Sequence, residues 1–179
     1  MSVLVAYASA RGSTGEIAER IAEKLRESCP SMTVRCSPIN AVDVTSLPSY
    51  SAVVVGSAIH MGSWLSPARH FIHNNATVLK ETAVWAFSVG MPPKEEDRRK
   101  EEQMVEEKIR KTLPNLRRHE LFEGRFNKND LPWFGRIIIS CCIPKEKTKF
   151  GDSRDWVEIN AWAEGIGKDI SVLSGGGTQ

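Results

Sequence analysis

The sequence predicts an α/β fold in which an open parallel sheet is covered by helices on both faces. Three short apolar runs, at residues 3–7, 52–56 and 83–89, show no alternation with polar residues. Runs of this kind are typical of strands buried on both faces. The stretches between and after them carry apolar residues at helical spacing. Strands that alternate with helices in this way are expected to form a parallel sheet.

The first helix and the second strand follow the opening run. The apolar side chains of residues 17–25 recur at three- and four-residue steps, which predicts an amphipathic helix. Ser13 and Glu16 have the spacing of a capping box, in which both side chains bind amides at a helix start. Residues 33–36 predict a short second strand, and its extension to Ile39 stays open.

The later elements complete a set of five strands. Ser66-Pro67 marks a helix start, because proline is tolerated in the first turn. Residues 95–113 have the pattern of a highly charged helix with a narrow apolar stripe, and residues 121–126 that of the fifth strand. The last helix is expected over about residues 153–173, where apolar side chains again recur at helical steps.

Length and composition fit one soluble, cytoplasmic domain. The 179 residues suffice for a sizeable core, and no apolar run approaches the length of a transmembrane helix. The start shows no signal-peptide pattern, and the four cysteines form no C-x-x-C pair, which favours reduced thiols. His70 and His73 lack a third ligand, so we expect no metal site. We expect one domain over residues 1–173, a disordered tail at 174–179, and no nucleic-acid partner.

Residues 9–14 lie between the first strand and the first helix and carry three hydroxyls, one glycine and no carboxylate. Hydroxyl and backbone donors at a helix N-terminus favour an anion, which points to a phosphate-bearing cofactor. The loop has neither the G-x-G-x-x-G pattern of a dinucleotide site nor the G-x-x-x-x-G-K-[ST] pattern of a P-loop. The alternative is that the stretch is only a capped helix start.

Two further loops are expected beside this one. In open parallel sheets, ligands bind outside the carboxyl ends of the strands at a topological switch point. This rule selects residues 57–64 and 88–93, since both follow predicted buried strands. Both loops are rich in small residues, which lets backbone amides approach a flat ligand.

Several side chains in these loops suit an aromatic ligand. Trp64 offers a stacking face, and Met61 and Met91 offer polarizable sulfur. An aromatic ring beside a phosphate loop is what FMN presents, although ordinary packing of these three side chains is the alternative. His60 is a candidate proton donor or substrate contact, and the alternative is a loop histidine that binds backbone.

The sequence resembles the flavodoxin-like superfamily, and within it the menaquinone-dependent protoporphyrinogen oxidase (protoporphyrinogen IX dehydrogenase) family. Residues 9–14 resemble its Ser-Thr-x-x-Gly-x-Thr phosphate loop at Ser9, Gly12 and Thr14, with Ala10 in place of the usual threonine, and Glu-Ile-Ala follows at 16–18. Residues 53–62 resemble its Val-Val-Ile-Gly-Ala-Ser-Ile-Arg-Tyr-Gly segment. Residues 87–89 resemble its Tyr-Ser-Val, and 155–156 lie where it has Thr-Asp-Trp.

The resemblance implies a three-layer flavodoxin-like fold with a five-stranded parallel sheet in the order 2-1-3-4-5. It also implies FMN as cofactor. Histidine replaces the family's arginine at His60, and methionine replaces its tyrosine at Met61, so the substrate and the redox tuning stay open. The residues expected to bind the cofactor are Ser9, Ala10, Arg11, Gly12, Ser13, Thr14, Ser57, Ala58, Ile59, His60, Met61, Gly62, Trp64, Ser88, Val89, Gly90 and Met91.

An insertion is expected after the fifth strand, at residues 124–150. The wider segment 114–150 holds eight basic and four acidic side chains, a net +4. The resembled family has a comparable insertion with an apolar, basic helix that is associated with quinone and membrane. Residues 131–149 are therefore a candidate for peripheral membrane contact. The alternatives are a helix packed on the domain or at a homodimer interface.

Two main functions remain open. In the first, an enzyme, FMN takes electrons from a porphyrinogen-like substrate and passes them to a quinone, and Arg125, Lys128 and Arg136 are candidate contacts to substrate carboxylates. In the second, the protein is an FMN electron carrier that docks to redox proteins. Carriers are typically acidic, whereas this chain carries a net charge of +2, which favours the enzyme. A third function, an NAD(P)H-dependent quinone reductase, has no dinucleotide fingerprint to support it.

Overall fold

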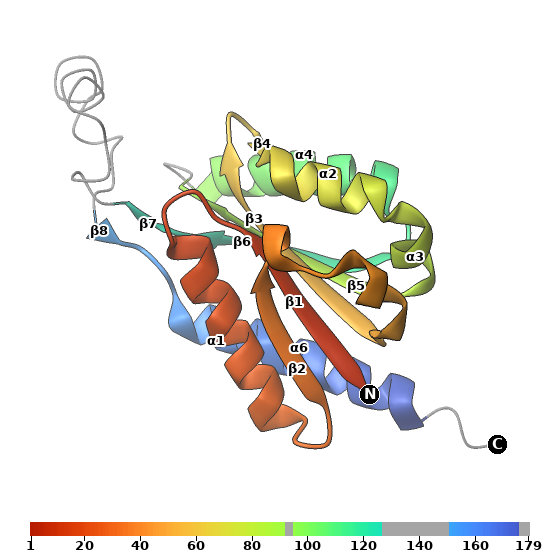
Figure 1. The fold of residues 1–179 in the computed structure, drawn as a ribbon. Helices are drawn as coiled ribbons and strands as arrows, with labels where there is room; N and C mark the ends of the chain where they lie inside the picture. Colours follow the sequence, from red (N-terminus) through yellow and green to blue (C-terminus); the bar gives the residue numbers. More distant parts are fainter. Residues whose placement is uncertain (92–94, 127–150, 176–179) are drawn as a thin grey trace, which may run out of the picture.

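The computed structural model describes residues 1–91, 95–126 and 151–175, and Figure 1 shows their arrangement. The strands are β1 (Ser2–Ala8), β2 (Thr33–Pro38), β3 (Ala52–His60), β4 (Ser63–Trp64), β5 (Ala83–Gly90), β6 (Leu116–Glu123), β7 (Arg125–Phe126) and β8 (Gly151–Asp152). The α-helices are α1 (Ser13–Ser28), α2 (Ser66–Asn74), α3 (Ala76–Glu81), α4 (Glu95–Thr112) and α6 (Trp156–Gly175). Two short 3₁₀ helices, Ile39–Ala41 and Val44–Ser49, connect β2 to β3.

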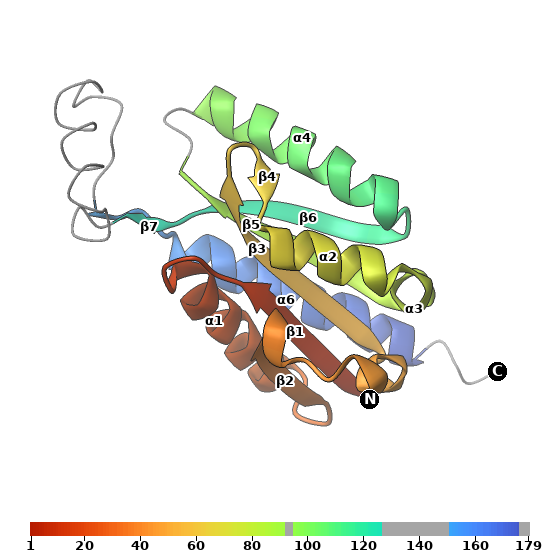
Figure 2. The ribbon, with the colours of Figure 1, turned by 45° about the horizontal axis from the view of Figure 1, so that its top comes forward.

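The main sheet confirms the predicted order. Its path is β2-β1-β3-β5-β6, and neighbouring strands on this path are parallel. The chain moves outward from β1 in both directions, so the switch point lies between β1 and β3 (Figure 2). Parallel strands end at a common edge, and the loops that follow them gather there.

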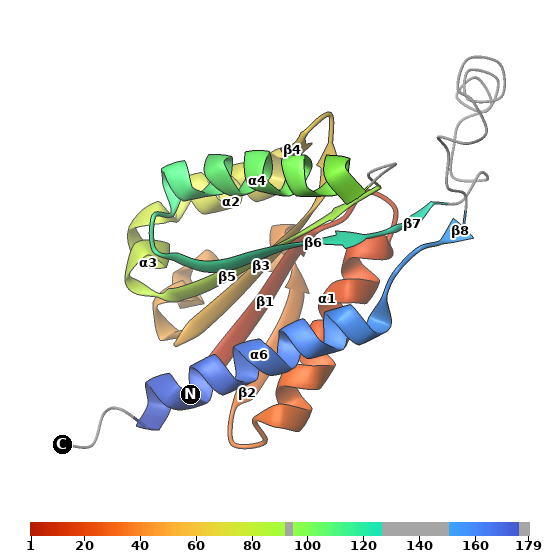
Figure 3. The same ribbon diagram turned by 180° about the vertical axis from the view of Figure 1, so that it is seen from behind.

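Helices cover both faces of this sheet, as the sequence predicts. Figures 1 and 3 show α1 and α6 on one face and α2, α3 and α4 on the other. Side chains along β1 alternate between the two layers. Val3 and Val5 pack in the core beneath α1 and α6, whereas Leu4 and Ala6 pack in the core beneath the other helices. The inner strands are therefore apolar on both faces.

The fifth strand of the main sheet differs from its prediction. β6 begins at Leu116, five residues earlier than expected, and ends at Glu123. Its first half is rich in charged residues because it forms an edge of the sheet, where polar side chains reach solvent. Arg125–Phe126 instead pair antiparallel with Gly151–Asp152 in a separate two-stranded ladder.

Two helix starts can be compared with the sequence. The prediction of a capping box at Ser13 and Glu16 is wrong, because Gly12 is the N-cap of α1 and no side chain caps this helix. The last helix is confirmed and begins at Trp156. The Asp155 carboxylate accepts hydrogen bonds from the amides of Val157 and Glu158, at 2.8 and 3.1 Å, and caps it.

Parts of three predictions lie outside the described residues. These are most of the insertion at 124–150, including the candidate membrane contact at 131–149; most of the tail at 174–179; and Pro92 and Pro93 of the third loop. They stay predictions. Within the ranges that the structure describes, no helix combines the length and apolar character needed to cross a membrane.

Candidate cofactor site at the carboxyl edge of the sheet

The loop between β1 and α1 is shaped for an anion. The Gly12 amide donates a hydrogen bond to Ser9 Oγ at 2.9 Å, and Gly12 has φ +90°, a left-handed conformation that glycine adopts readily. The amide of Glu16 donates to the carbonyl of Gly12 and closes the first turn of α1. The three preceding amides, at residues 13–15, have no carbonyl partner within the helix. They are donors that a phosphate can use.

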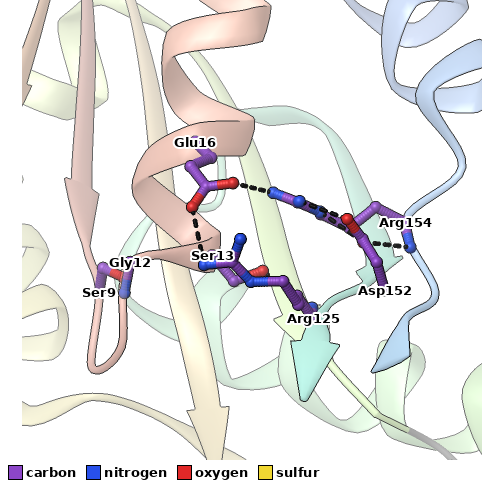
Figure 4. Close-up of polar contacts among 7 residues, drawn as sticks. All are labelled: Ser9, Gly12, Ser13, Glu16, Arg125, Asp152 and Arg154. Carbon is purple, nitrogen blue, oxygen red and sulfur yellow. Dashed lines mark hydrogen bonds and ion pairs between the residues drawn. The ribbon is translucent and has the colours of Figure 1, made fainter. Parts of the chain in front are cut away.

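Figure 4 shows Ser9, Gly12 and Ser13 of the predicted phosphate loop. Ala10 and Arg11 are exposed, whereas Thr14 is buried in the first turn of α1. Ser13 Oγ accepts a hydrogen bond from the Arg125 amide at 3.0 Å. The hydroxyl that the capping box assigned to the helix start therefore holds a strand from the far end of the chain.

A cluster of ion pairs lies beside the loop. The Glu16 carboxylate pairs with Arg125 at 3.0 Å and with Arg154 at 2.5 Å, as Figure 4 shows. Arg154 also pairs with Asp152 at 2.5 Å and lies 4.5 Å from the ring centroid of Trp156. The hydrogen bond from Arg154 lowers the pKa of Asp152, and the same contact raises the pKa of Arg154. Sequence reasoning missed Arg154 because its partner Glu16 lies 138 positions away, and it missed Asp152 because this carboxylate joins the cluster through Arg154.

The second predicted loop is a hairpin instead. β3 continues to His60 and pairs with β4 across a two-residue turn, in which Met61 has φ +52° and Gly62 φ +68°. Left-handed conformations at both central positions are those of a type I′ turn. His60 is exposed, and Met61 at the tip is 92% exposed. Lys108 Nζ donates a hydrogen bond to the Gly62 carbonyl at 2.7 Å and joins the tip to α4.

For Trp64, the structure favours ordinary packing, the alternative to stacking on a ligand. Trp64 is 4% exposed and packs in the core beneath α2 and α4. Its Nε1 donates a hydrogen bond to Ser88 Oγ at 2.7 Å, and the same oxygen lies 2.8 Å from His119 Nε2. The Ser88 hydroxyl therefore forms its hydrogen bonds with buried side chains of the core. Burial lowers the pKa of His119 to about 4.

Other predicted residues surround this interior network. The Ser57 hydroxyl donates to the Ala58 carbonyl at 2.9 Å and accepts from the Leu65 amide at 3.1 Å. Both hydrogen bonds of its side chain therefore go to backbone groups on either side of the hairpin turn. Val89 is buried, and Ile59 packs partly buried against the helices. For these positions, the backbone is what a ligand at the sheet edge can reach.

The third predicted loop is shorter than expected, because β5 continues to Gly90. Ser88 and Val89 are strand residues, and Met91 follows the strand and is half-buried. A carboxylate that the sequence did not predict lies here: Glu101 Oε2 stands 3.4 Å from where a Cβ on Gly90 would be. Burial raises the pKa of Glu101. Nothing in the sequence singles out Glu101, because it is one of many acidic residues in the highly charged helix α4.

Two cavities flank these elements. One of about 350 Å³ lies beside the phosphate loop and is lined by Tyr7, Ala8, Ser9, Pro38, Ile39, Asn40, Leu65 and Pro67. The larger, of about 500 Å³, lies between α2 and α4 and touches the hairpin through Ser63 and Trp64. No residue of the phosphate loop lines it, whereas Ser9 lines the smaller cavity.

The donors at this edge fit FMN. The start of α1 offers amides and hydroxyls, with the guanidinium of Arg125 beside them, which suits a phosphate. The hairpin tip and the end of β5 lie at the same edge of the sheet (Figure 1), and both belong to strands bonded across it. No group of three metal-ligating side chains occurs within residues 1–91, 95–126 and 151–175.

Comparisons with known proteins agree with this geometry. A family model described as a flavodoxin domain matches residues 4–153, whereas no curated protein matches the chain. A flavodoxin from the domain Archaea has a TM-score of 0.61 at 15% identity, covering 96% of this chain and 99% of its own. Oxidised Flavodoxin 2 from Bacillus cereus has a TM-score of 0.60 at 18% identity, covering 94% and 99%. An apo NADH:FMN oxidoreductase has a TM-score of 0.58 at 12% identity, covering 94% and 89%. At these identities the structural likeness establishes the fold.

Proposed function

The chain belongs to the flavodoxin domain family, and from this membership we propose that it is an FMN-dependent oxidoreductase. The observation that carries the proposal is the start of α1, where three amides without intrahelical partners and the hydroxyl loop stand at the switch-point edge of the sheet. When bound, FMN supplies the exchange of electrons. The chain supplies the site that binds and orients it.

The residues of the proposed site form two groups, one for the phosphate of FMN and one for its ring. The loop at 9–12 and the first turn of α1 hold the phosphate through amides and hydroxyls. The hairpin tip, with His60 and Met61, and the end of β5 flank the ring. His60 is exposed at the tip, so it can exchange a proton with solvent or contact a substrate.

An enzyme with a porphyrinogen-like donor and a quinone acceptor is our first candidate. The family model identifies a flavodoxin domain. The choice of a porphyrinogen-like donor and a quinone acceptor rests on the resemblance of residues 53–62 and 155–156 to the protoporphyrinogen oxidase family. It is supported by the weakly basic charge and by the basic, apolar insertion, because an acidic substrate and a hydrophobic acceptor suit such a surface. Contact with a membrane through residues 131–149 belongs to this candidate.

An electron carrier is the second candidate. The two flavodoxins compared above align with this chain over 99% of their own length. In addition, Met61 is 92% exposed at the hairpin tip. An exposed apolar side chain beside a redox group suits brief docking to a protein partner. An NAD(P)H-dependent reductase remains a third candidate, because the NADH:FMN oxidoreductase shares the fold.

The cofactor is tested by denaturing the purified holoprotein and separating the released flavin. We expect FMN and not FAD. A chain that is colourless and binds no added FMN contradicts the whole proposal.

The reaction is tested by anaerobic mixing of the FMN-loaded protein with protoporphyrinogen, followed by a menaquinone analogue. We expect bleaching of the flavin absorbance and then its return. A protein that resists both but exchanges electrons rapidly with a ferredoxin is a carrier, and that result contradicts the first candidate.

A further inference from the structure

Glu16 holds two arginines at the mouth of the phosphate loop. Its Oε1 lies 3.0 Å from Arg125 Nη2, and its Oε2 lies 2.5 Å from Arg154 Nη1. The same Oε1 is 3.9 Å from where a Cβ on Gly12 would stand, so the carboxylate lies against the loop. A negative charge this close opposes a bound phosphate unless a cation neutralises it.

The two arginines are held very differently. The Arg154 side chain is 5% exposed, binds Asp152 as well as Glu16, and lies over the Trp156 ring. The Arg125 side chain is 39% exposed and pairs with Glu16, and its charge acts on Asp152 only as the weakest of the causes that lower the pKa of that carboxyl. Arg154 is therefore fixed beside Glu16, and the more exposed guanidinium of Arg125 can leave at little cost.

The backbone of Arg125 is fixed at the phosphate loop. Its amide donates to Ser13 Oγ at 3.0 Å, and the preceding amide, of Gly124, donates to the Gly90 carbonyl at 3.0 Å. A Cβ on Gly124 would stand 3.4 Å from Ser13 Oγ, so the strand passes close against the start of α1. The Arg125 side chain therefore extends from a backbone position that is hydrogen-bonded to Ser13, a residue predicted to bind the phosphate.

We propose that Arg125 is a further binding residue for the FMN phosphate, held by Glu16 when no phosphate is bound. The inference rests on the proposed function and concerns which residues hold that cofactor. A phosphate monoester carries more negative charge than a carboxylate and accepts the planar guanidinium in a bidentate manner. Arg125 therefore transfers from Glu16 to the phosphate, and Arg154 remains on Glu16.

The test compares FMN with riboflavin, which has the same ring and lacks the phosphate. Apoprotein of the full chain is titrated into each flavin and the quenching of flavin fluorescence is measured. For Arg125→Gln we expect FMN affinity to fall about tenfold and riboflavin affinity to stay within about twofold. Arg118→Gln is the matched control, since it removes another exposed, ion-paired arginine, on β6, and we expect it to change neither affinity.

Two more variants keep the proposal testable if Arg125→Gln folds poorly, which the circular dichroism spectrum and melting curve report. Arg125→Lys keeps the charge without the planar fork, so we expect a smaller loss of FMN affinity. Glu16→Gln removes the carboxylate that competes for Arg125, so we expect FMN binding to become tighter. A purely structural role for the Glu16–Arg125 pair predicts the opposite, a loss of affinity in Glu16→Gln.

The outcomes separate the inference from the proposed function. Wild-type protein that binds neither flavin overturns both. Wild-type protein that binds FMN, with Arg125→Gln unchanged or weakened equally toward both flavins, overturns the inference alone.

Discussion

Ser88 Oγ and His119 Nε2 lie 2.8 Å apart in the interior, on neighbouring strands β5 and β6. The indole of Trp64 donates to the same oxygen, so one buried hydroxyl joins the hairpin to both strands. His119 Nδ1 is buried and has no hydrogen-bond partner among the described residues. A charged imidazolium here would leave a buried donor unsatisfied, so the folded state requires the neutral ring.

His119 makes the fold sensitive to acid. Burial lowers the pKa of His119 from 6.5 to about 4, and among the neighbouring charges Glu106 opposes this shift while Arg110 adds to it. The unfolded chain therefore binds a proton between these values that the folded chain does not, and stability falls as the pH falls from 6.5 to 4. From this group alone, the free energy of unfolding is about 3 kcal/mol higher at pH 7 than at a pH below 4. Urea unfolding of His119→Gln should lose this pH dependence, while His73→Gln, at an exposed histidine on α2, should keep it. Equal slopes in both variants would count against the assignment.

Gly56 allows the aromatic core to pack against β3. A Cβ at this position would stand 2.0 Å from Phe87 Cζ, and Phe87 is fully buried against Phe122 and Trp162. Gly56→Ala should therefore lower the free energy of unfolding by about 3 kcal/mol, in the range of core overpacking. Gly165→Ala is the matched control. Its Cβ meets nothing closer than 3.9 Å in α6, so it should stabilise the protein by up to about 1 kcal/mol. Denaturant melts of both variants decide this.

Lys108 steadies the hairpin tip through the Gly62 carbonyl. The turn includes a non-glycine residue with positive φ, Met61, so it has a strained conformation to maintain. Lys108→Gln should raise amide hydrogen exchange across residues 60–64 several-fold with little change in global stability, because the contact is exposed. Lys111→Gln, at an exposed lysine of the same helix, is the control. Unchanged exchange in Lys108→Gln would show that the ammonium does not hold the tip.

Glu101 is costly to ionise where it lies. Burial raises its pKa above the ordinary 4.5, so the folded state binds more protons than the unfolded state above that pH. Stability from this group is full below pH 4.5 and is lost as the pH rises through the higher value. Glu101→Gln should therefore be more stable than wild type at pH 7, and Glu107→Gln, an exposed acid on α4, should not. A destabilised Glu101→Gln would indicate that the carboxylate makes a favourable contact in its charged form.

The sequence predicted those elements whose signal is local. The apolar runs of β1, β3 and β5 arise because both faces of each strand are covered, and α1 shows its buried stripe. The first half of β6 was not predicted, because an edge strand does not need a continuous run of apolar residues. The turn at Met61-Gly62 escaped because methionine is an unusual residue for that conformation.

The sequence signal for the candidate site was strongest at residues 9–14 and weaker elsewhere. The composition of residues 9–14 pointed directly to an anion. The sequence left stacking and packing open for Trp64, because its partner Ser88 lies on another strand and is bonded in turn to His119, in a stretch of β6 that was not recognised as a strand. The pairing of Glu16 with Arg154 joins opposite ends of the chain, and no local pattern reports such a contact.

The small ladder of β7 and β8 has a consequence for how this fold can diversify. Phe126 pairs with Gly151, so two positions far apart in the sequence lie side by side. This pairing forms its own two-stranded sheet, and the path β2-β1-β3-β5-β6 does not include it. Substitutions in β7 and β8 can therefore accumulate without changing the register of the main sheet.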